Sequence, residues 1–138
     1  MRYLIDTNIL IRLANEPSAI SKDIENIIED TDNLIYVSAV SMQEIFMLMS
    51  DNKLGKSRWR KPIDVFRYIE NELYFPIKYV FEEHLLAFAS IIPATGHNDP
   101  FDRMIIAQAI AERVPLISSD TKFHHYSKQK LEFIFNDK

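Results

Sequence analysis

Short runs of apolar residues alternate along this chain with segments in which apolar residues recur every three or four positions. The short runs are typical of buried strands, and the recurring positions are typical of helices with one buried face. This pattern predicts strands over residues 3–5, 34–37, 75–79, 114–118 and 132–135. It predicts helices over residues 9–14, 18–30, 41–50, 63–73, 81–92, 99–113 and 121–126. Such alternation favours an α/β fold, in which helices cover both faces of a parallel sheet.

The helix predicted over residues 99–113 is the most informative of these segments. It opens with two carboxylates three residues apart, Asp99 and Asp102, and is then almost wholly apolar until Glu112. Asp99 suits the N-cap, and Pro100 suits the first helical position because no backbone N–H is needed there. The two carboxylates share one face of the helix. We therefore expect a buried helix whose acidic end lies at the rim of a cleft and can hold a cation.

The composition narrows the class of protein. With 138 residues, of which 47% are hydrophobic and 26% charged, the chain is expected to form a single soluble domain over residues 1–138. The absence of cysteine excludes disulfides, thiolate metal sites and cysteine nucleophiles, and it suits a reducing cytoplasm. No apolar run approaches the roughly 18 residues of a transmembrane helix. Met1 leads directly into a strand without a signal-peptide pattern. We expect a cytoplasmic protein without a membrane contact.

The charge balance argues mildly against general nucleic-acid binding, because the net charge is −4 and the pI is about 5.5. A metal site would offset part of this negative charge locally. Basic residues gather in one stretch, which consists of Lys53, Lys56, Arg58, Arg60 and Lys61. This stretch is either a solvated loop or a basic patch that contacts the phosphates of a nucleic acid. Within it, Trp59 could stack on an unpaired base, anchor the loop or lie in a protein interface.

Five carboxylates are expected at one end of the sheet. Asp6 and Asp120 each directly follow a predicted strand, and Glu44 lies in the first turn of the helix after the second strand. Asp99 and Asp102 open the helix that precedes the strand ending at Asp120. Ligands of open parallel sheets bind beyond the carboxyl ends of the strands, where the strand order reverses. Clustered carboxylates remain ionised only beside a cation, and an all-oxygen set without histidine or cysteine suits Mg²⁺ or Mn²⁺.

Each carboxylate also has a purely structural interpretation. Ser41 and Glu44 have the spacing of a capping box, in which Glu44 would bond back to the start of its own helix. Asp6, Asp99 and Asp120 could each cap the helix that follows. A functional site is favoured only because all these candidate caps fall at the same predicted end of the sheet.

Two further polar residues flank the acidic helix start. Arg103 could contact a phosphate, but an ion pair with Asp99 or Glu112 is the expected use of this side chain. His97 precedes the helix in a loop that contains glycine; it could approach a substrate, but we expect it simply to be exposed. Neither residue is expected to bind a metal ion.

Four segments carry the candidate acids in a recurring polar context. They are Asp-Thr-Asn at 6–8, Ser-Ala-Val-Ser-Met-Gln-Glu at 38–44, the segment 97–109 and Ser-Ser-Asp at 118–120. Together they resemble the four acidic motifs of the PIN domain ribonucleases, particularly the VapC-like toxins of prokaryotic toxin–antitoxin systems. The most specific part is Asp-Pro-Phe-Asp-Arg at 99–103, followed by Ile-Ala-Gln-Ala at 106–109.

This resemblance implies a three-layer α/β/α fold with a central, mostly parallel sheet of four to five strands. It also implies endonucleolytic cleavage of RNA with Mg²⁺ or Mn²⁺, a small antitoxin partner and compatibility with a homodimer. The acidic quartet is matched by Asp6, Glu44, Asp102 and Asp120. Asp99 matches an extra acidic position of the Asp-Pro-Phe-Asp-Arg subgroup. The small polar positions beside the acids are matched by Thr7, Asn8 and Ser118, of which the last is often threonine in the family.

Three function classes follow from these residues. In a metal-dependent endoribonuclease, Asp6, Asp102 and Asp120 would hold the metal, and Glu44 would be either a ligand or the general base. In a metal-dependent phosphohydrolase, Asp6 would be a covalent nucleophile, but that class expects a second aspartate where Asn8 stands. A non-catalytic binding module with the same fold is the third class, although all its acidic positions are filled here.

Overall fold

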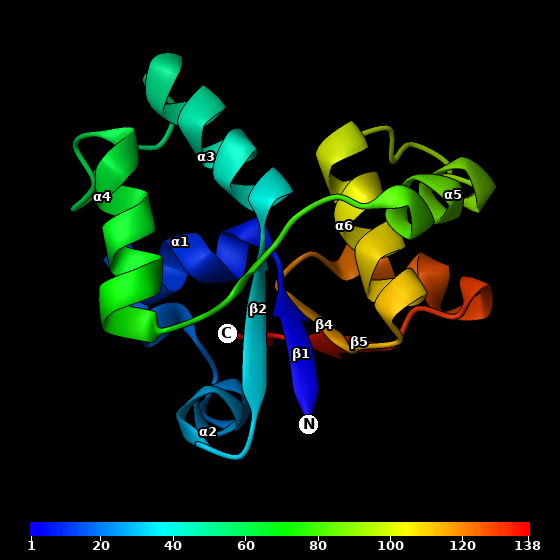
Figure 1. Ribbon diagram of the computed structural model, residues 1–138, viewed down its shortest axis with the longest axis horizontal. Helices are drawn as coiled ribbons and strands as arrows, with labels where there is room; N and C mark the ends of the chain where they lie inside the picture. The colour runs from blue at the N-terminus through cyan, green and yellow to red at the C-terminus, as the bar shows by residue number, and fades with distance from the viewer.

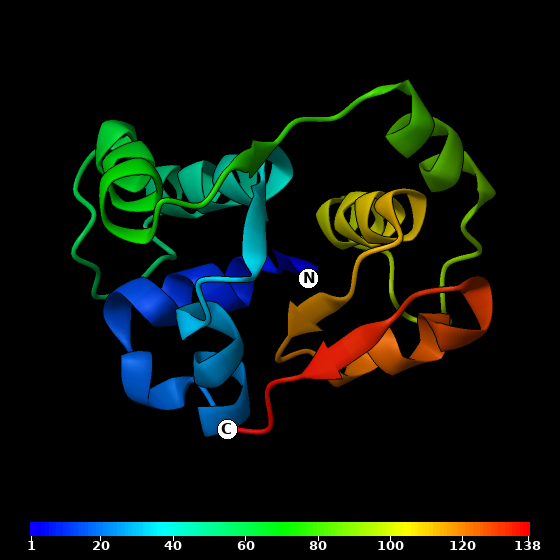
Figure 2. The same ribbon diagram turned by 60° about the horizontal axis from the view of Figure 1, so that its bottom comes forward.

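The computed structural model describes residues 1–138, and its five strands form one parallel sheet. The strands are β1 (Arg2–Ile5), β2 (Leu34–Ser38), β3 (Ile77–Lys78), β4 (Leu116–Ser118) and β5 (Phe133–Phe135). Their order across the sheet is β3-β2-β1-β4-β5, which can be followed in Figure 2. From β1 the chain adds β2 and β3 on one side, and later β4 and β5 on the other. The strand order therefore reverses between β1 and β4, and ligands of such sheets bind at the carboxyl ends of these two strands.

Helices cover both faces of this sheet, which confirms the predicted α/β fold. The helices are α1 (Thr7–Asn15), α2 (Lys22–Glu29), α3 (Ala39–Ser50), α4 (Pro62–Arg67), α5 (Glu82–Ser90) and α6 (Pro100–Glu112). Shorter helical turns are η1 (Pro17–Ala19), the π-helical η2 (Tyr68–Leu73) and the 3₁₀-helical η3 (Thr121–Gln129). In Figure 1, α1 to α4 lie on one side of the strands, and α5, α6 and η3 lie on the other. The longest helix, α6, has 13 residues, and no helix could serve as a membrane span.

Two apolar cores hold the three layers together. Successive residues of β1 point to opposite faces, so Tyr3 and Ile5 enter one core and Leu4 enters the other. The first core fills the space between the sheet and α1 to α4, and the second lies between the sheet, α5, α6 and η3. Ile105 and Ile106 of α6 are completely buried in the second core. The expected burial of the acidic helix is therefore confirmed.

The starts of α1, α2 and α3 differ from the sequence prediction by two or more residues, and α1 begins at Thr7 instead of residue 9. Helix α3 begins at Ala39 instead of Ser41, because the Ser38 hydroxyl caps it by accepting from the Val40 N–H at 3.0 Å. The predicted capping box of Ser41 and Glu44 is therefore wrong. The helix predicted over residues 18–30 begins only at Lys22, after a separate turn.

The third strand is shorter than the predicted segment 75–79. Only Ile77 and Lys78 pair with β2, at the edge of the sheet. Pro76 lacks an N–H and contributes only its carbonyl, which accepts from the Val37 N–H at 3.1 Å. The edge position and the proline together limit this strand to two residues.

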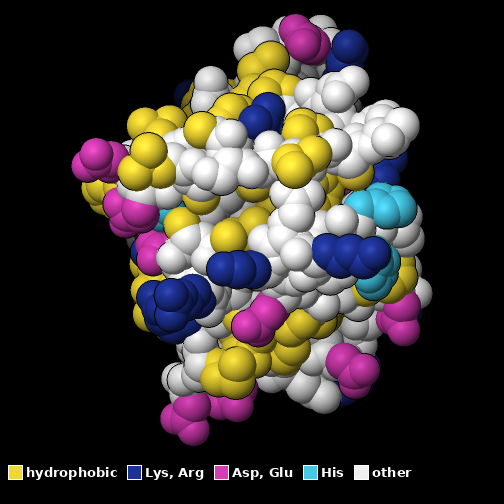
Figure 3. All heavy atoms as spheres, turned by 90° about the vertical axis from the view of Figure 1, so that its right-hand side faces the viewer, with side chains coloured by type: hydrophobic (Ala, Val, Ile, Leu, Met, Phe, Trp, Pro, Cys, Tyr) yellow, Lys and Arg dark blue, Asp and Glu magenta, His cyan; other side chains and the backbone are white.

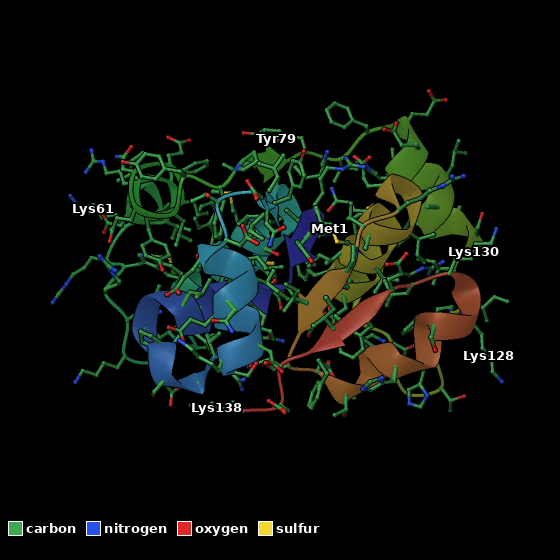
Figure 4. The ribbon with its side chains drawn as sticks, turned by 90° about the horizontal axis from the view of Figure 1, so that it is seen from below. Met1, Lys61, Tyr79, Lys128, Lys130 and Lys138 are labelled. Atoms are coloured by element: carbon green, nitrogen blue, oxygen red, sulfur yellow. The ribbon has the colours of Figure 1, made fainter.

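The basic loop between α3 and α4 is anchored by its tryptophan. Trp59 is 5% exposed and packs edge-on against Tyr68, with the ring centroids 5.7 Å apart. The adjacent Arg58 N–H donates to Asn15 Oδ1 at 2.9 Å, which ties the loop to α1. Burial of the indole excludes base stacking and leaves the anchoring interpretation. Figure 4 shows Lys61 of this loop at one end of the molecule, opposite Lys128 and Lys130.

The outer face of α5 is unusually apolar for a surface helix. Leu85 and Leu86 are 55% and 63% exposed, and Ile92 just beyond the helix is 73% exposed. Figure 3 shows the side of the molecule that carries α5, where hydrophobic side chains are interspersed with charged ones.

Candidate active site

Asp6 lies at the junction of β1 and α1, and both of its carboxylate oxygens accept hydrogen bonds. The side chain is 2% exposed and caps α1, with Oδ1 accepting from the Thr7 N–H at 2.8 Å. Oδ2 accepts from Asn8 Nδ2 at 3.0 Å and from the Ser118 hydroxyl at 2.7 Å. Three donors from two neighbouring strand ends therefore fix the orientation of this carboxylate.

Ser118 and Asn8 also connect the ends of β1 and β4. The Ser118 oxygen accepts from the Asp120 N–H at 3.0 Å while its proton goes to Asp6. Asn8 Oδ1 accepts from the Ser119 N–H at 3.1 Å. The small polar residues beside the acids thus hold Asp120 next to Asp6.

Glu44 reaches the site from α3, the helix that follows β2. Helices α1 and α3 are joined by a hydrogen bond of 3.0 Å from the Thr7 hydroxyl to the Ser41 hydroxyl, both of them buried. Glu44 lies about one turn further along α3. Its Oε1 atom is buried and has no hydrogen-bond partner. A buried carboxylate oxygen without a partner is costly unless something absent from the protein satisfies it.

Asp99 and Asp102 come from the first turn of α6. Asp99 caps the helix, with Oδ1 accepting from the Phe101 N–H at 2.8 Å, and Asp102 follows on the same face. Further along α6, the buried Gln108 accepts a hydrogen bond from the Ser38 hydroxyl at the end of β2. This bond ties α6 to the start of α3, and Figure 1 shows α6 beginning at the top of the view and running down beside the strands.

The five carboxylates meet at one cavity of about 280 Å³. Its lining consists of Asp6, Thr7, Asn8, Ile11, Glu44, Leu48, Asp99, Asp102 and Asp120. Oxygen atoms of Glu44, Asp99 and Asp102 lie within 4.8 Å of one another. Asp102 also belongs to a second group of this kind, with Asp120 and His97. Asp102 is therefore the carboxylate that both groups share.

Burial and mutual repulsion raise the pKa values of three of these acids. The pKa of Asp6 rises to about 7, chiefly through burial and secondly through the charge of Asp102. Burial likewise raises the pKa of Glu44, the nearby Thr7 hydroxyl opposes this rise, and the charges of Asp102 and Asp99 add to it. The pKa of Asp102 is raised by burial and by Asp99, against a lowering hydrogen bond from His97. Such a cluster favours either protons or a cation at its centre.

The donor set fits a hard divalent cation. All five groups offer carboxylate oxygens, which Mg²⁺ and Mn²⁺ prefer, and no thiolate is available. The unpartnered Oε1 of Glu44 is an oxygen that a cation would satisfy. The cavity thus has both the ligand chemistry and the unbalanced charge of a metal site.

Comparison with known families gives this cavity a context. The sequence model of the PIN domain matches residues 3–129, which is most of the chain. The chain belongs to the PIN domain family. The match includes every acid that lines the cavity, so the resemblance of the acidic motifs is borne out at the level of the family.

Solved structures give the same result for the fold of this PIN domain. A chain of VapBC2 from Rickettsia felis, bound to a DNA fragment from its promoter, has a TM-score of 0.70 at 18% identity, covering 99% of this chain and 100% of that one. VapBC-1 from nontypeable Haemophilus influenzae has a TM-score of 0.69 at 19% identity, with both chains fully covered. VapBC-5 from Mycobacterium tuberculosis, of a family of toxin–antitoxin systems, has 0.62 at 16%, covering 97% and 98%. The fold is therefore VapC-like. No curated protein matches the sequence.

Arg103 of this PIN domain lies outside the acidic cavity. Its guanidinium donates from Nε and Nη2 to the Phe88 carbonyl at 3.2 and 3.0 Å, and from Nη2 to the Ile91 carbonyl at 3.3 Å. It also lies over the Phe88 ring, 4.3 Å from the centroid. The expected ion pair with Asp99 or Glu112 is wrong, because the planar fork instead satisfies the carbonyls at the end of α5.

Arg103→Ala is therefore expected to weaken the fold and leave the cavity intact. Loss of two carbonyl partners should lower the free energy of unfolding by about 1–3 kcal/mol, measured by urea denaturation. Arg103→Lys keeps the charge without the planar fork and should recover only part of this loss. Weaker Mn²⁺ binding by Arg103→Ala without a loss of stability would instead assign Arg103 to the site.

His97 is the site residue that the sequence did not reveal. It was expected to be exposed, but it is 6% exposed and its Nε2 lies 2.9 Å from Asp102 Oδ2. Its Nδ1 lies 2.7 Å from the Tyr126 hydroxyl of η3. The only signal in the sequence was its position five residues before Asp102, since nothing local shows that η3 folds over this loop.

Proposed function

We propose that this PIN domain, residues 1–138, is a Mg²⁺- or Mn²⁺-dependent endoribonuclease that acts in the cytoplasm as the toxin of a toxin–antitoxin pair. The observation that carries the proposal is the convergence of five carboxylates on one cavity of a PIN domain. The unpartnered Oε1 of Glu44 within this cavity supports a bound cation. The chain has no cysteine and so needs no disulfide, which agrees with a location in the reducing cytoplasm.

The residues that would hold the cation follow from the distances. Oxygen atoms of Glu44, Asp99 and Asp102 lie within 4.8 Å of one another, and Asp120 forms a second such group with Asp102 and His97. Asp6 is fixed at the end of β1, and its ionised form would be favoured by a neighbouring cation. Such a cation supplies charge neutralisation for a phosphodiester and lowers the pKa of water in the site.

The chain itself offers a base for hydrolysis. Glu44 would act either as a ligand of the cation through its buried Oε1 or as the base, and its raised pKa suits a group that accepts a proton from water. Water would form a bond to phosphorus and give a proton to the base, while the bond from phosphorus to the opposite ester oxygen breaks and that oxygen leaves with the electron pair and takes up a proton from solvent. Asp6 would remain fixed during this step, since Thr7, Asn8 and Ser118 all donate to it.

A polymeric substrate is supported by a second cavity beside the acidic one. This cavity, of about 580 Å³, lies between α1 and the basic loop and shares Ile11 with the acidic cavity. Its lining includes Arg12, Lys56 and Arg58. An RNA strand that leaves the acidic cavity past Ile11 would place its next phosphates beside these cations.

The phosphohydrolase alternative has less support. Asp6 would have to attack phosphorus, but it is 2% exposed and both of its oxygens already accept hydrogen bonds. A nucleophile needs an activated and accessible atom. Attack by water therefore agrees better with the geometry than attack by Asp6.

A small antitoxin partner is supported by the fold comparison. The VapBC structures similar to this chain are of toxin–antitoxin complexes, one of them bound to promoter DNA. We propose that this chain is the toxin of such a pair. The apolar outer face of α5, with Leu85 and Leu86, would be available to a second copy if the protein forms a homodimer.

Cleavage of RNA by the purified protein tests the proposed activity. The protein, freed of any partner, should cleave RNA in the presence of Mg²⁺ or Mn²⁺ and lose this activity with EDTA. Asp6→Asn should be inactive because it alters the charge at the base of the cavity. Equal cleavage by the unaltered protein and by Asp6→Asn would reject the proposal, since a contaminating ribonuclease ignores the substitution.

A further inference from the structure

We propose that His97, held by Tyr126, is a positioning residue that orients the Asp102 carboxylate for the cation. This inference rests on the proposed function, because it concerns the carboxylate that both acidic groups share. His97 lies at the back of the acidic cavity and is not among its lining residues. It therefore acts through Asp102 and does not touch a substrate.

The hydrogen-bond network determines which nitrogen of His97 carries the proton. The Tyr126 oxygen accepts from the Ala94 N–H at 2.9 Å, so its own proton is free to go to His97 Nδ1 at 2.7 Å. Nδ1 is then an acceptor, and Nε2 carries the ring proton. This proton is donated to Asp102 Oδ2 at 2.9 Å. The network thus fixes the tautomer that a carboxylate partner requires.

The surroundings of His97 leave its ring little freedom. The ring is 6% exposed and packs against Phe123 and Tyr126, with centroids 5.8 and 5.5 Å away. Both aromatic residues lie on η3, the turn that Asp120 caps. His97 therefore links the start of α6 to η3, and with them the two acids Asp102 and Asp120.

The hydrogen bond from His97 gives the two carboxylate oxygens of Asp102 different partners. Oδ2 accepts from Nε2, whereas no donor of the protein contacts Oδ1. Oδ1 is thus the oxygen that remains for a cation near Glu44 and Asp99. Hydrogen bonds to a ligating carboxylate set its orientation, and their loss typically costs metal affinity.

The chain contains a matched control for this arrangement. His84 is also fully buried, and its Nδ1 accepts from the Phe81 N–H at 2.9 Å while Nε2 lies 3.3 Å from Glu112 Oε1. Glu112 also pairs with Lys78 at 2.8 Å, at the opposite end of α6 from the acidic cavity. His84 therefore has the same type of network without a connection to the acidic cavity, although it forms a separate group of possible ligands with Glu83 and Glu112.

Two substitutions separate the two bonds of His97. In His97→Gln the amide nitrogen takes the place of Nε2 and can still donate to Asp102, but the contact with Tyr126 is lost. In His97→Asn the amide group takes the place of Nδ1, so the bond to Asp102 is lost and a contact with Tyr126 remains. A residue with only a structural role would not distinguish between these variants in cation binding.

The test is the Mn²⁺ dissociation constant of each folded variant, measured by calorimetry on metal-free protein. His97→Asn should weaken Mn²⁺ binding by roughly 10–100-fold, whereas His97→Gln should keep most of the affinity. His84→Asn should lower the melting temperature without changing the dissociation constant. Equal effects of His97→Asn and His97→Gln, or an unchanged constant in both, would overturn the positioning role. If the unaltered protein does not bind Mn²⁺, the cation in the proposed function fails together with it.

Discussion

Asp102→Asn is expected to lower the rate of RNA cleavage by roughly 1,000-fold, if the lost oxygen supplies several kcal/mol of charge stabilisation. Asp102 is the one acid common to both groups of clustered side chains, and its Oδ1 has no donor within the protein. Asparagine keeps the size of the side chain and removes its charge. The measurement is the single-turnover cleavage rate of one RNA at saturating Mn²⁺.

Asp99→Asn provides the comparison for this prediction. Asp99 belongs to only one of the two groups, and its Oδ1 already caps α6. Asparagine is also an effective N-cap, so the helix should remain stable. We expect a smaller loss of activity from this variant, of about tenfold or less, because a peripheral ligand is removed. Small and equal effects from the two variants would mean that the cation lies elsewhere.

The second large effect is expected in the pH dependence of stability of the metal-free protein. Asp6 loses its proton near pH 3.8 when unfolded, but at a pH of about 7 when buried in the fold. Between these values the folded state binds more protons than the unfolded state, so stability falls as the pH rises. Three pKa units correspond to about 4 kcal/mol, fully present below pH 4 and lost above pH 7.

Asp6→Asn isolates this contribution because asparagine does not titrate. The difference in free energy of unfolding between the unaltered protein and the variant should shift by up to about 4 kcal/mol between pH 4 and pH 8. Chemical denaturation in EDTA at each pH gives this difference. Addition of Mn²⁺ at pH 8 should restore stability to the unaltered protein more than to the variant. A difference that does not change with pH would show that Asp6 ionises normally in the fold.

Much of the fold was readable from the sequence because local rules and tertiary structure agree. The apolar runs at β1, β2 and β4 became buried parallel strands, and Asp99 with Pro100 began α6 as expected. The acids that follow these strands were expected at one end of the sheet simply because parallel strands have their carboxyl ends at the same edge. The predicted helix boundaries were less accurate where two nearby hydroxyl groups could each cap the helix, as with Ser38 and Ser41 at the start of α3.

The remaining features depend on contacts between distant segments. His97 is buried only because η3, some 25 residues later, brings Phe123 and Tyr126 over it. Arg103 turns away from the acids because the end of α5 presents carbonyl groups to it. Neither the loop before α6 nor its first turn contains this information, so local patterns favoured an exposed histidine and an ion-paired arginine.

The central claim is that the carboxylates of this PIN domain promote attack by water on an RNA phosphodiester. The most direct measurement uses an RNA in which the ribose at the cleaved linkage lacks its 2′-hydroxyl. With Mn²⁺ present, the unaltered protein should still cut this linkage, and Asp102→Asn should not, because water is the nucleophile. Loss of cleavage on removal of the 2′-hydroxyl, or cutting that persists in EDTA, would contradict the account.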